Sequence, residues 1–212
     1  MKKKFDPIFV IISGGSGSGK TTVANLVKKN LPKWCTSEVV SLDNFYIPRN
    51  KIKTNNYDSP EAIDWFLVRS AIVSLIKDQK TTKIPIYDFT KQMYTGTKLI
   101  KPVDVLIFEG ILALYDENIK DMANIKIYID VPDDERLIRR LKRDLKSRGS
   151  DVDKTISAWR ENVIRMHHKY VEPTKYISDL IIPWGGDKEN LIPIKAISGA
   201  LEYAIYSGKN KK

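Results

Sequence analysis

An apolar run followed at once by a glycine-rich loop constrains the fold of this chain more than any other feature. Residues 8–12 read Ile-Phe-Val-Ile-Ile, and residues 14–21 read Gly-Gly-Ser-Gly-Ser-Gly-Lys-Thr. The run has the length and continuous apolarity of a parallel strand that is buried on both faces. The loop matches the pattern G-x-x-x-x-G-K-[ST], and a helix is expected to start at Thr21. This order of strand, loop and helix predicts a phosphate-binding α/β fold.

The residue types of the loop suit a nucleoside triphosphate. Glycines allow backbone N–H groups to turn toward phosphate oxygens, and the positive end of the following helix adds to this attraction. Lys20 is expected to reach the β- and γ-phosphates, and the Thr21 hydroxyl to bind Mg²⁺. The spacing G-x-G-x-x-G, typical of nicotinamide-dependent folds, is absent from the loop. The expected triphosphate site comprises Gly14, Gly15, Ser16, Gly17, Ser18, Gly19, Lys20, Thr21 and Thr22.

Strand and helix patterns alternate along the rest of the chain. Apolar runs predict strands at 38–42, 103–108, 125–129 and 180–182, and helical patterns cover 21–30, 60–76, 133–146, 152–168 and 191–206. Extended pieces at 83–89 and 94–100 predict a hairpin. Five strands alternating with helices predict an α/β fold with a doubly wound, parallel, five-stranded sheet and flanking helices. Ligands then bind beyond the carboxyl ends of the strands. In the 60–76 helix, a 3.6-residue period predicts a core-facing stripe of Ile63, Phe66, Ile72, Val73 and Ile76.

The distribution of charge narrows the choice of ligand. No repeat or break in composition divides the chain, so residues 1–212 are expected to form a single domain. The formal net charge is +10, but six lysines lie in terminal tails at 1–4 and 209–212, which are expected to be flexible. Residues 136–148 hold seven basic residues against one acid, Asp144, and the remaining body is close to neutral. Such a local concentration favours a compact polyphosphate over a long nucleic acid as partner.

Composition also bears on the compartment. No apolar run approaches the roughly 18 residues that a membrane-spanning helix needs, and the apolar stretch near the N-terminus is too short for a secretory signal. The single cysteine, Cys35, cannot form an internal disulfide, which suits a reducing compartment. We therefore expect a soluble, cytoplasmic protein with no membrane partner.

Acidic residues follow two of the expected strands at the edge where the loop begins. Glu109 follows the apolar residues 105–108 and is expected to be a Mg²⁺ ligand; the alternative is a solvated acid at a strand end. Asp43 follows residues 39–42, where a carboxylate could orient and deprotonate an acceptor hydroxyl and also contact the metal. Asp58 adds an acid on the acceptor side; the alternative is that it belongs to the N-cap region of the helix that starts at Pro60. Two acids would repel a phosphorylated acceptor and favour a neutral polyol.

Basic residues predict a mobile cover for the site. Arg136, Arg140 and Arg143 recur at i, i+4 and i+7 on one helical face, and Arg148 and Gly149 follow like a hinge. This pattern predicts a lid at about 136–150 whose arginines fold over the transferring phosphoryl group; a solvated basic face is the alternative. The opposite face is expected to be held against the body by Leu137, Leu141 and Leu145.

An ordered series of motifs between about residues 8 and 206 resembles the uridine/cytidine kinase family of P-loop kinases. The motifs are GGSGSGKTT, SLDNFY, NYDSP, IPIYDF, VLIFEGILA, RLIRRLKRDLKSRG, EPTKY and IIPWGGD. The resemblance implies transfer of the γ-phosphate of ATP or GTP to the 5′-hydroxyl of uridine or cytidine, in homo-oligomers that are usually tetramers. It matches Asp43 to the catalytic base, Arg143 and Arg148 to lid arginines on the phosphates, and Asp187 to a position near the ATP adenine. It also matches nucleoside-site positions to Tyr46, Asp58, Tyr87 and Arg140.

Several positions depart from the family pattern. Ser150 stands where an arginine commonly follows Arg-Gly, and Trp184 replaces an arginine; Ala158 and Trp159 replace a usual Gln-Tyr. Gln92 stands where many members have histidine. Its amide offers both a donor and an acceptor, so Gln92 is expected to serve both pyrimidines if Tyr87 and Phe89 form a slot for the base. Such alternating aromatics are also typical of an ordinary core. The adjacent residues His167 and His168 are expected on a helix surface.

Three other functions stay open at this point. A relative could phosphorylate a different neutral hydroxyl, such as that of nicotinamide riboside or pantothenate. A basic RNA-binding NTPase would show salt-sensitive RNA binding, although Asp43 and Asp58 argue against it. A regulatory protein without turnover would bind ATP in a way that no nucleoside accelerates.

Overall fold

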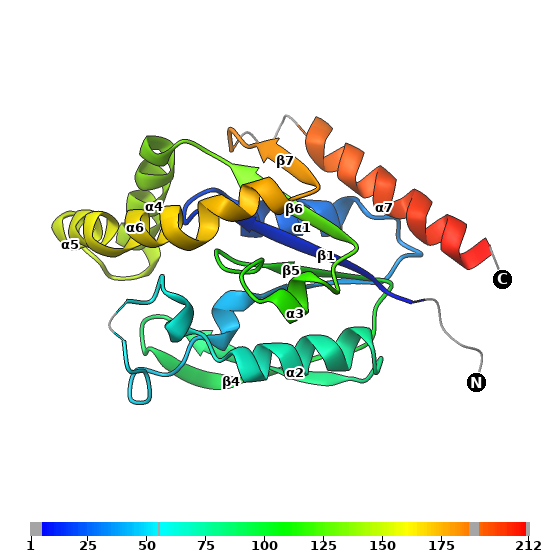
Figure 1. Cartoon of the computed structure of the whole chain (residues 1–212), viewed down its shortest axis with the longest axis horizontal. Coiled ribbons are helices and arrows are strands. Elements are labelled where there is room, and N and C mark those ends of the chain that lie inside the picture. Colours follow the sequence, from blue (N-terminus) through cyan, green and yellow to red (C-terminus); the bar gives the residue numbers. More distant parts are fainter. Residues whose placement is uncertain (1–5, 55, 187–190, 211–212) are drawn as a thin grey trace.

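A parallel sheet of five strands forms the centre of the computed structural model, which describes residues 6–54, 56–186 and 191–210 (Figure 1). The strand order is β2-β5-β1-β6-β7. The prediction of five strands in one sheet from the alternation of strands and helices is confirmed. Each neighbouring pair is parallel. The strands are β1 (Ile8–Gly14), β2 (Ser37–Ser41), β5 (Val105–Glu109), β6 (Ile125–Asp130) and β7 (Leu180–Pro183).

Alternate residues of the central strand β1 point into two separate cores. Phe9 and Ile11 belong to one core, whereas Val10 and Ile12 belong to the other. The first core lies under α2 (Trp65–Ile76) and α3 (Glu117–Lys120), and the second lies under α1 (Lys20–Asn30) and α7 (Ile192–Asn210). A strand that is apolar at every position is therefore explained by burial on both faces.

The remaining elements are a hairpin, short 3₁₀ turns and the helices of the lid. The hairpin β3 (Thr82–Asp88) and β4 (Met93–Ile100) forms a second, antiparallel sheet. Short 3₁₀ turns follow β2 (Leu42–Phe45), precede α2 (Pro60–Ala62) and precede β7 (Glu172–Ile177). The lid helix α4 (Asp133–Ser147), together with α5 (Val152–Ala158) and α6 (Ile164–Met166), projects at one end of the molecule (Figure 1).

The region expected to be one helix at 60–76 is broken, and one expected core residue is exposed. A 3₁₀ turn ends at Ala62, and α2 begins only at Trp65, where the Asp64 side chain accepts the N–H of Leu67. Within α2 the buried face is formed by Val68, Ala71, Ile72 and Leu75, and Phe66 lies on another face. The prediction that Phe66 faces the core is therefore wrong: its side chain is 82% exposed.

Two five-residue π-helical segments interrupt the helix expected at 152–168. They span Trp159–Val163 and His167–Val171, on either side of α6. Both begin at a buried residue, so the prediction that His167 lies on a helix surface is wrong, whereas His168 is half-exposed. At the C-terminus, α7 extends to Asn210, into the segment that had been expected to be a tail.

Candidate functional site

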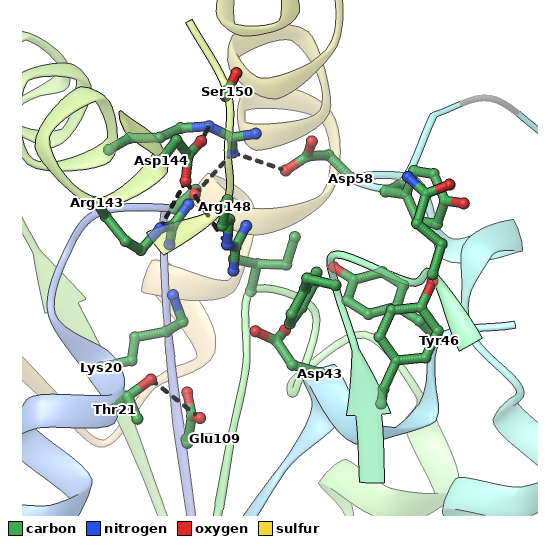
Figure 2. Close-up of a pocket in the computed structure, with 17 residues that line it drawn as sticks. Lys20, Thr21, Asp43, Tyr46, Asp58, Glu109, Arg143, Asp144, Arg148 and Ser150 are labelled. Atoms are coloured by element: carbon green, nitrogen blue, oxygen red, sulfur yellow. Dashed lines mark hydrogen bonds and ion pairs between the residues drawn. The ribbon is translucent and has the colours of Figure 1, made fainter. Parts of the chain in front are cut away.

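A pocket of about 270 Å³ opens at the carboxyl ends of β1, β2 and β5, beneath the lid (Figure 2). It brings together residues from the phosphate loop, the hairpin and the lid, which are far apart in the sequence. The pocket is lined by Ser16, Lys20, Thr21, Asp43, Tyr46, Tyr57, Asp58, Tyr87, Phe89, Gln92, Glu109, Ile111, Arg140, Arg143, Asp144, Arg148 and Ser150. Thirteen of these residues had been expected in the site from the sequence. The other four are Tyr57, Ile111, Asp144 and Ser150, of which Ser150 had been noted as a departure from the family pattern.

The phosphate loop has the backbone form that its glycines allow. Gly17 and Gly19 have φ angles of +83° and +92°, in the left-handed region that favours glycine. A Cβ atom on Gly19 would lie 2.9 Å from the Trp184 ring, so this position also needs glycine for space. The Ser18 hydroxyl is buried without a hydrogen-bond partner, and the Lys20 ammonium donates to the Gly15 carbonyl at 3.1 Å. The loop thus holds a buried cation and a free hydroxyl group where phosphates are expected.

Buried charges of opposite sign meet beside the loop. The Thr21 hydroxyl donates to Oε1 of Glu109 at 3.2 Å. Burial lowers the pKa of Lys20, and the charge of Glu109 opposes that shift. Burial raises the pKa of Glu109, and the nearby carboxylate of Asp43 raises it further. Two carboxylates and a hydroxyl are hard oxygen donors of the kind that Mg²⁺ prefers. The residues present therefore fit a divalent cation, which would relieve the repulsion between Asp43 and Glu109.

Asp43 is positioned at the boundary between two halves of the pocket. The strand β2 ends at Ser41, whose hydroxyl accepts the Asp43 N–H at 3.3 Å and caps the following turn. In Figure 2, Asp43 lies between the side of the pocket that holds Lys20 and the side that holds Tyr46. A carboxylate at this boundary can accept a proton from a group that enters from the aromatic side.

The far half of the pocket is aromatic. Tyr46, Tyr87 and Phe89 pack with ring centroids 5.3–5.7 Å apart. The hydroxyls of Tyr57 and Tyr87 are both buried. Gln92 lines the same space and has a φ of +52°, an uncommon conformation for a side chain of its size. An apolar slot with polar groups suits a flat heterocycle that carries hydrogen-bonding atoms.

Asp58 lies at the top of this aromatic half. Burial raises the pKa of its carboxyl, and the Arg140 guanidinium opposes the shift. The ion pair between Arg140 Nη1 and Asp58 Oδ1 measures 3.7 Å. Asp58 also lies outside the 3₁₀ turn that begins at Pro60, where Ser59 provides the cap, so a capping role falls to Ser59.

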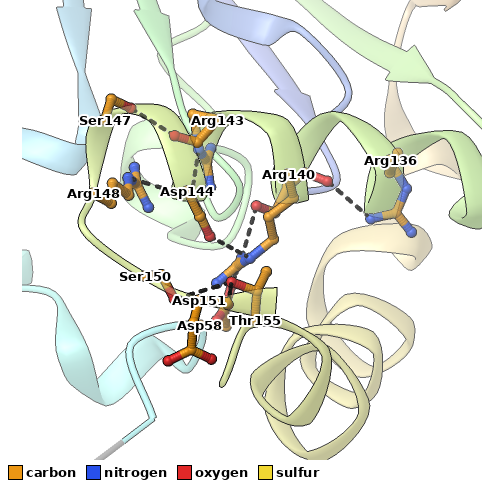
Figure 3. A network of polar contacts seen from close by, with 11 residues as sticks. Asp58, Arg136, Arg140, Arg143, Asp144, Ser147, Arg148, Ser150, Asp151 and Thr155 are labelled. Carbon is orange, nitrogen blue, oxygen red and sulfur yellow. Dashed lines mark hydrogen bonds and ion pairs between the residues drawn. The ribbon is translucent and has the colours of Figure 1, made fainter. Parts of the chain in front are cut away.

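The lid presents three arginines around one acid that the sequence analysis had only counted as a charge (Figure 3). Arg143 donates to Oδ1 of Asp144 at 2.9 Å, and Arg140 Nε lies 3.2 Å from Oδ2. Arg148 Nε lies 3.7 Å from Oδ1, and its guanidinium stacks over the Phe89 ring at 4.1 Å. Arg140 also donates to the Ser16 hydroxyl at 2.9 Å and so connects the lid to the loop.

Two expectations about the lid helix are wrong. Arg136 does not line the pocket; it is 1% exposed and pairs with Asp133 behind the loop. Leu145 does not hold the helix against the body, because it is 46% exposed, whereas Leu137 and Leu141 are partly buried; the fully buried side chains of α4 are those of Arg136 and Asp144. The helix therefore contacts the body through its charged face, which a helical pattern of leucines cannot reveal.

The positions that depart from the family pattern have different surroundings. Ser150 lines the pocket, and its hydroxyl lies 3.0 Å from that of Thr155. Trp159 is buried under the Arg136 guanidinium, which lies 5.2 Å from its ring centroid. Trp184 is buried beside the phosphate loop. Asp187, expected near the adenine, falls outside the described residues.

A cluster of His167, His168 and Glu172 lies beside the base of the lid, with candidate ligand atoms within 4.8 Å of one another. The positive charge of Arg136 contributes to lowering the pKa of His167, after burial, to about 4. The same charge disfavours a metal cation at this cluster, so we assign no metal to it. Among the described residues, no helix is both long and apolar enough to span a membrane.

Comparison with known proteins agrees with this geometry. Residues 9–190 match the phosphoribulokinase / uridine kinase family. The chain belongs to this family. Among its relatives, the uridine kinase of Lactobacillus helveticus is 37% identical over 97% of this chain and 99% of its own length. The uridine kinase of Mycoplasma genitalium is 38% identical over 96% of this chain and 97% of its own.

Two solved structures share the fold. A possible uridine kinase from Bacillus stearothermophilus matches with a TM-score of 0.64 and 19% identity, over 85% of this chain and 90% of that chain. A putative fructose transport system kinase from Silicibacter sp. TM1040 matches with a TM-score of 0.69 and 22% identity, over 86% and 92% of the two chains. At these identities the likeness supports the fold alone.

Proposed function

We propose that this protein transfers the γ-phosphate of ATP, or of GTP, to the 5′-hydroxyl of uridine and cytidine and so yields UMP and CMP for pyrimidine salvage. The observation that carries the proposal is the position of Asp43 between a phosphate loop and an aromatic pocket. The names of the relatives support the acceptor class. A neutral nucleoside also suits the pocket, because the acids Asp43 and Asp58 would repel an acceptor that already carries phosphate.

The residues divide the reaction between them. Asp43 would accept the proton of the 5′-hydroxyl as its oxygen bonds to the γ-phosphorus and the bond to the β-phosphate oxygen breaks. Lys20 would hold the β- and γ-phosphates. Arg143 and Arg148 would stabilise the charge that develops on the transferred group. The buried Nη2 of Arg143 has no hydrogen-bond partner among the described residues, so it would be available to bind a phosphate oxygen.

Mg²⁺ is the cofactor that the acidic corner would hold. Thr21 and Glu109 are the expected ligands, directly or through water, with Asp43 nearby as a further oxygen donor. When bound, the ion would neutralise charge on the β- and γ-phosphates.

Recognition of the base would fall to Tyr87, Phe89 and Gln92. Uridine offers an acceptor at position 4 of the base and cytidine a donor, and an amide can present either group by rotating. Asp58 would accept hydrogen bonds from ribose hydroxyls, and its ion pair with Arg140 would hold its carboxylate in place. We also propose that the protein acts in the cytoplasm. It would assemble into a homo-oligomer, which the family resemblance indicates is a tetramer.

A coupled assay that detects ADP tests this function. The purified protein is given ATP and Mg²⁺ with uridine, cytidine, adenosine, guanosine, nicotinamide riboside or pantothenate in turn. We expect kcat/KM for uridine and cytidine to lie within about tenfold of each other and at least about tenfold above the other acceptors. Lys20→Ala serves as the inactive control. Faster turnover of nicotinamide riboside or pantothenate, or no turnover of any nucleoside, would contradict the proposal.

A further inference from the structure

Asp144 lies where the electrostatics of a helix disfavour an acid. It occupies the last turn of α4, and its carbonyl accepts the N–H groups of Arg148 and Ser150 at 3.1 and 3.3 Å. The carbonyl end of a helix carries partial negative charge, so a carboxylate there is locally unfavourable. Its side chain is nevertheless only 7% exposed. A pocket residue that goes against this helix preference is expected to have a function in the site.

The role is visible in the surroundings of the carboxylate. Guanidinium groups of Arg140, Arg143 and Arg148 all lie within 3.7 Å of its two oxygens. Three cations gathered in one partly buried place repel one another, and the pKa of Arg148 shows this: it is lowered first by burial and then by the charge of Arg143. Asp144 is the acid that all three share (Figure 3).

The contacts leave the arginines free to act on a ligand. Nη2 of Arg143 is buried without a partner, and Arg140 reaches Ser16 of the phosphate loop while its Nε faces Asp144. Asp144 therefore contacts the Nε of each guanidinium, which leaves Nη2 of Arg143 available to a ligand while Nη1 of Arg140 binds Ser16. A planar guanidinium held in this way is oriented before a phosphate arrives.

We propose that Asp144 is a positioning residue for phosphoryl transfer, which orients Arg140, Arg143 and Arg148 against their mutual repulsion. The proposal rests on the proposed function, because it takes Arg143 and Arg148 to act on the transferred phosphate and Arg140 to hold Asp58. Asp144 touches no reacting atom. Its negative charge faces the triphosphate, so it opposes binding of ATP in the ground state while it improves the geometry of the transition state.

This opposition distinguishes positioning from a merely structural role. In Asp144→Asn, we expect kcat with uridine to fall by at least about tenfold. The dissociation constant of Mg²⁺-ATP, measured by calorimetry without nucleoside, should stay within about twofold or become smaller, because one repulsive charge is gone. Asp134→Asn removes the same charge from the exposed first turn of the same helix and should leave both values within about twofold. An unchanged kcat in Asp144→Asn, or ATP affinity that falls together with the melting temperature, would overturn the proposal.

A double-mutant cycle with Arg143→Ala tests whether Asp144 acts through the arginines. If it does, adding Asp144→Asn to Arg143→Ala should cost less in kcat than Asp144→Asn costs alone. Losses that multiply independently would overturn the proposal. Should Asp144→Asn not fold, Asp144→Glu, which keeps the charge, decides: a reduced kcat with retained ATP affinity supports positioning, and a wild-type kcat refutes it.

The same cycle separates this proposal from the proposed function. If the wild-type protein phosphorylates no nucleoside, the proposed function fails, yet ATP binding still reports on the lid. The effects of Arg143→Ala and Asp144→Asn on the dissociation constant of Mg²⁺-ATP should then be non-additive. Additive effects on ATP binding would overturn the role of Asp144 independently of any acceptor.

Discussion

Arg136 donates a hydrogen bond from Nη1 to the carbonyl oxygen of Ser16, 3.4 Å away, and so joins the lid helix to the backbone of the phosphate loop. Its Nε donates to the carbonyl of Val131 at 3.2 Å, and its guanidinium packs over Trp159. A Cβ atom on Gly15 would lie 2.2 Å from Nη1 of Arg136. The glycine therefore allows the arginine to approach, and the arginine in turn fixes the loop from behind.

Removal of Arg136 should weaken both the fold and the ATP site. Arg136→Ala leaves two buried carbonyls without their donor and opens a cavity under the loop, so we expect a loss of about 3 kcal/mol in the free energy of unfolding. The affinity for Mg²⁺-ATP should fall by at least about tenfold, because the loop loses its support. Denaturant titration and calorimetry measure the two effects. Arg136→Lys keeps the charge without the planar fork and should recover them only in part; full recovery in that variant would show that charge alone suffices.

Arg143 should affect turnover more than ATP binding. Its contribution grows as charge moves onto the transferred phosphoryl group, so Arg143→Ala should lower kcat by at least about tenfold, near 1.4 kcal/mol. The KM for ATP should change less than kcat. Steady-state kinetics with saturating uridine give both values, and Lys142→Ala, which removes an exposed neighbouring charge, is the control. An unchanged kcat with a raised KM for ATP would place Arg143 in ground-state binding instead.

The stability of the protein should depend on pH through His167. Burial and the charge of Arg136 lower the pKa of His167 to about 4, although Asp133 and Glu172 act in the opposite direction. The unfolded chain then binds more protons than the folded one between pH 4 and about 6.5. The free energy of unfolding therefore rises with pH across that window, and the contribution of His167 is fully present above about pH 6.5. Complete protonation of His167 would lower the free energy of unfolding by about 3 kcal/mol.

His167→Gln isolates this contribution. Chemical denaturation at pH 4.5, 5.5 and 7 should show a smaller pH dependence in His167→Gln than in the wild type. Equal slopes in His167→Gln and the wild type would show that His167 titrates normally.

Much of the site followed from local patterns and one rule of sheet topology. The phosphate loop is a contiguous motif, and Asp43 and Glu109 were located because carboxyl ends of parallel strands share one edge of the sheet. The sequence-based fold was correct for the same reason: alternating apolar strands and helices limit the possible topologies.

The errors came from long-range packing that a local pattern does not encode. Arg136 has the same helical spacing as Arg140 and Arg143, yet its side chain is buried behind the phosphate loop, where it contacts the Ser16 carbonyl. The role of Asp144 depends on three partners whose side-chain directions the sequence does not specify. The burial of His167 depends on π-helical turns, which shift the phase of the helix. For Phe66, the period of apolar residues selected a face of α2 that does not pack on the core.

Gln92 should determine the use of both pyrimidines. Gln92→Leu leaves the polar 4-position of either base unpaired, so kcat/KM for uridine and cytidine should fall together. Gln92→Gly is the second variant to measure, because Gln92 has a positive φ. It removes the amide and also removes the backbone strain of a side chain in the left-handed region. Both variants should lose both pyrimidines if the amide matters. If Gln92→Gly keeps wild-type kcat/KM, the amide has no such role, and Ser150 becomes the better guide to the acceptor.

The most direct test of the account is the rate of phosphoryl transfer from ATP to the 5′-hydroxyl of uridine in the Asp43→Asn variant. Single-turnover measurement, with UMP identified as the product, separates this step from product release. Asn keeps the shape of Asp43 but cannot take the proton, so the rate should fall by roughly 10²–10⁴ while uridine still binds. Retention of more than about a tenth of the wild-type rate would show that Asp43 is not the base.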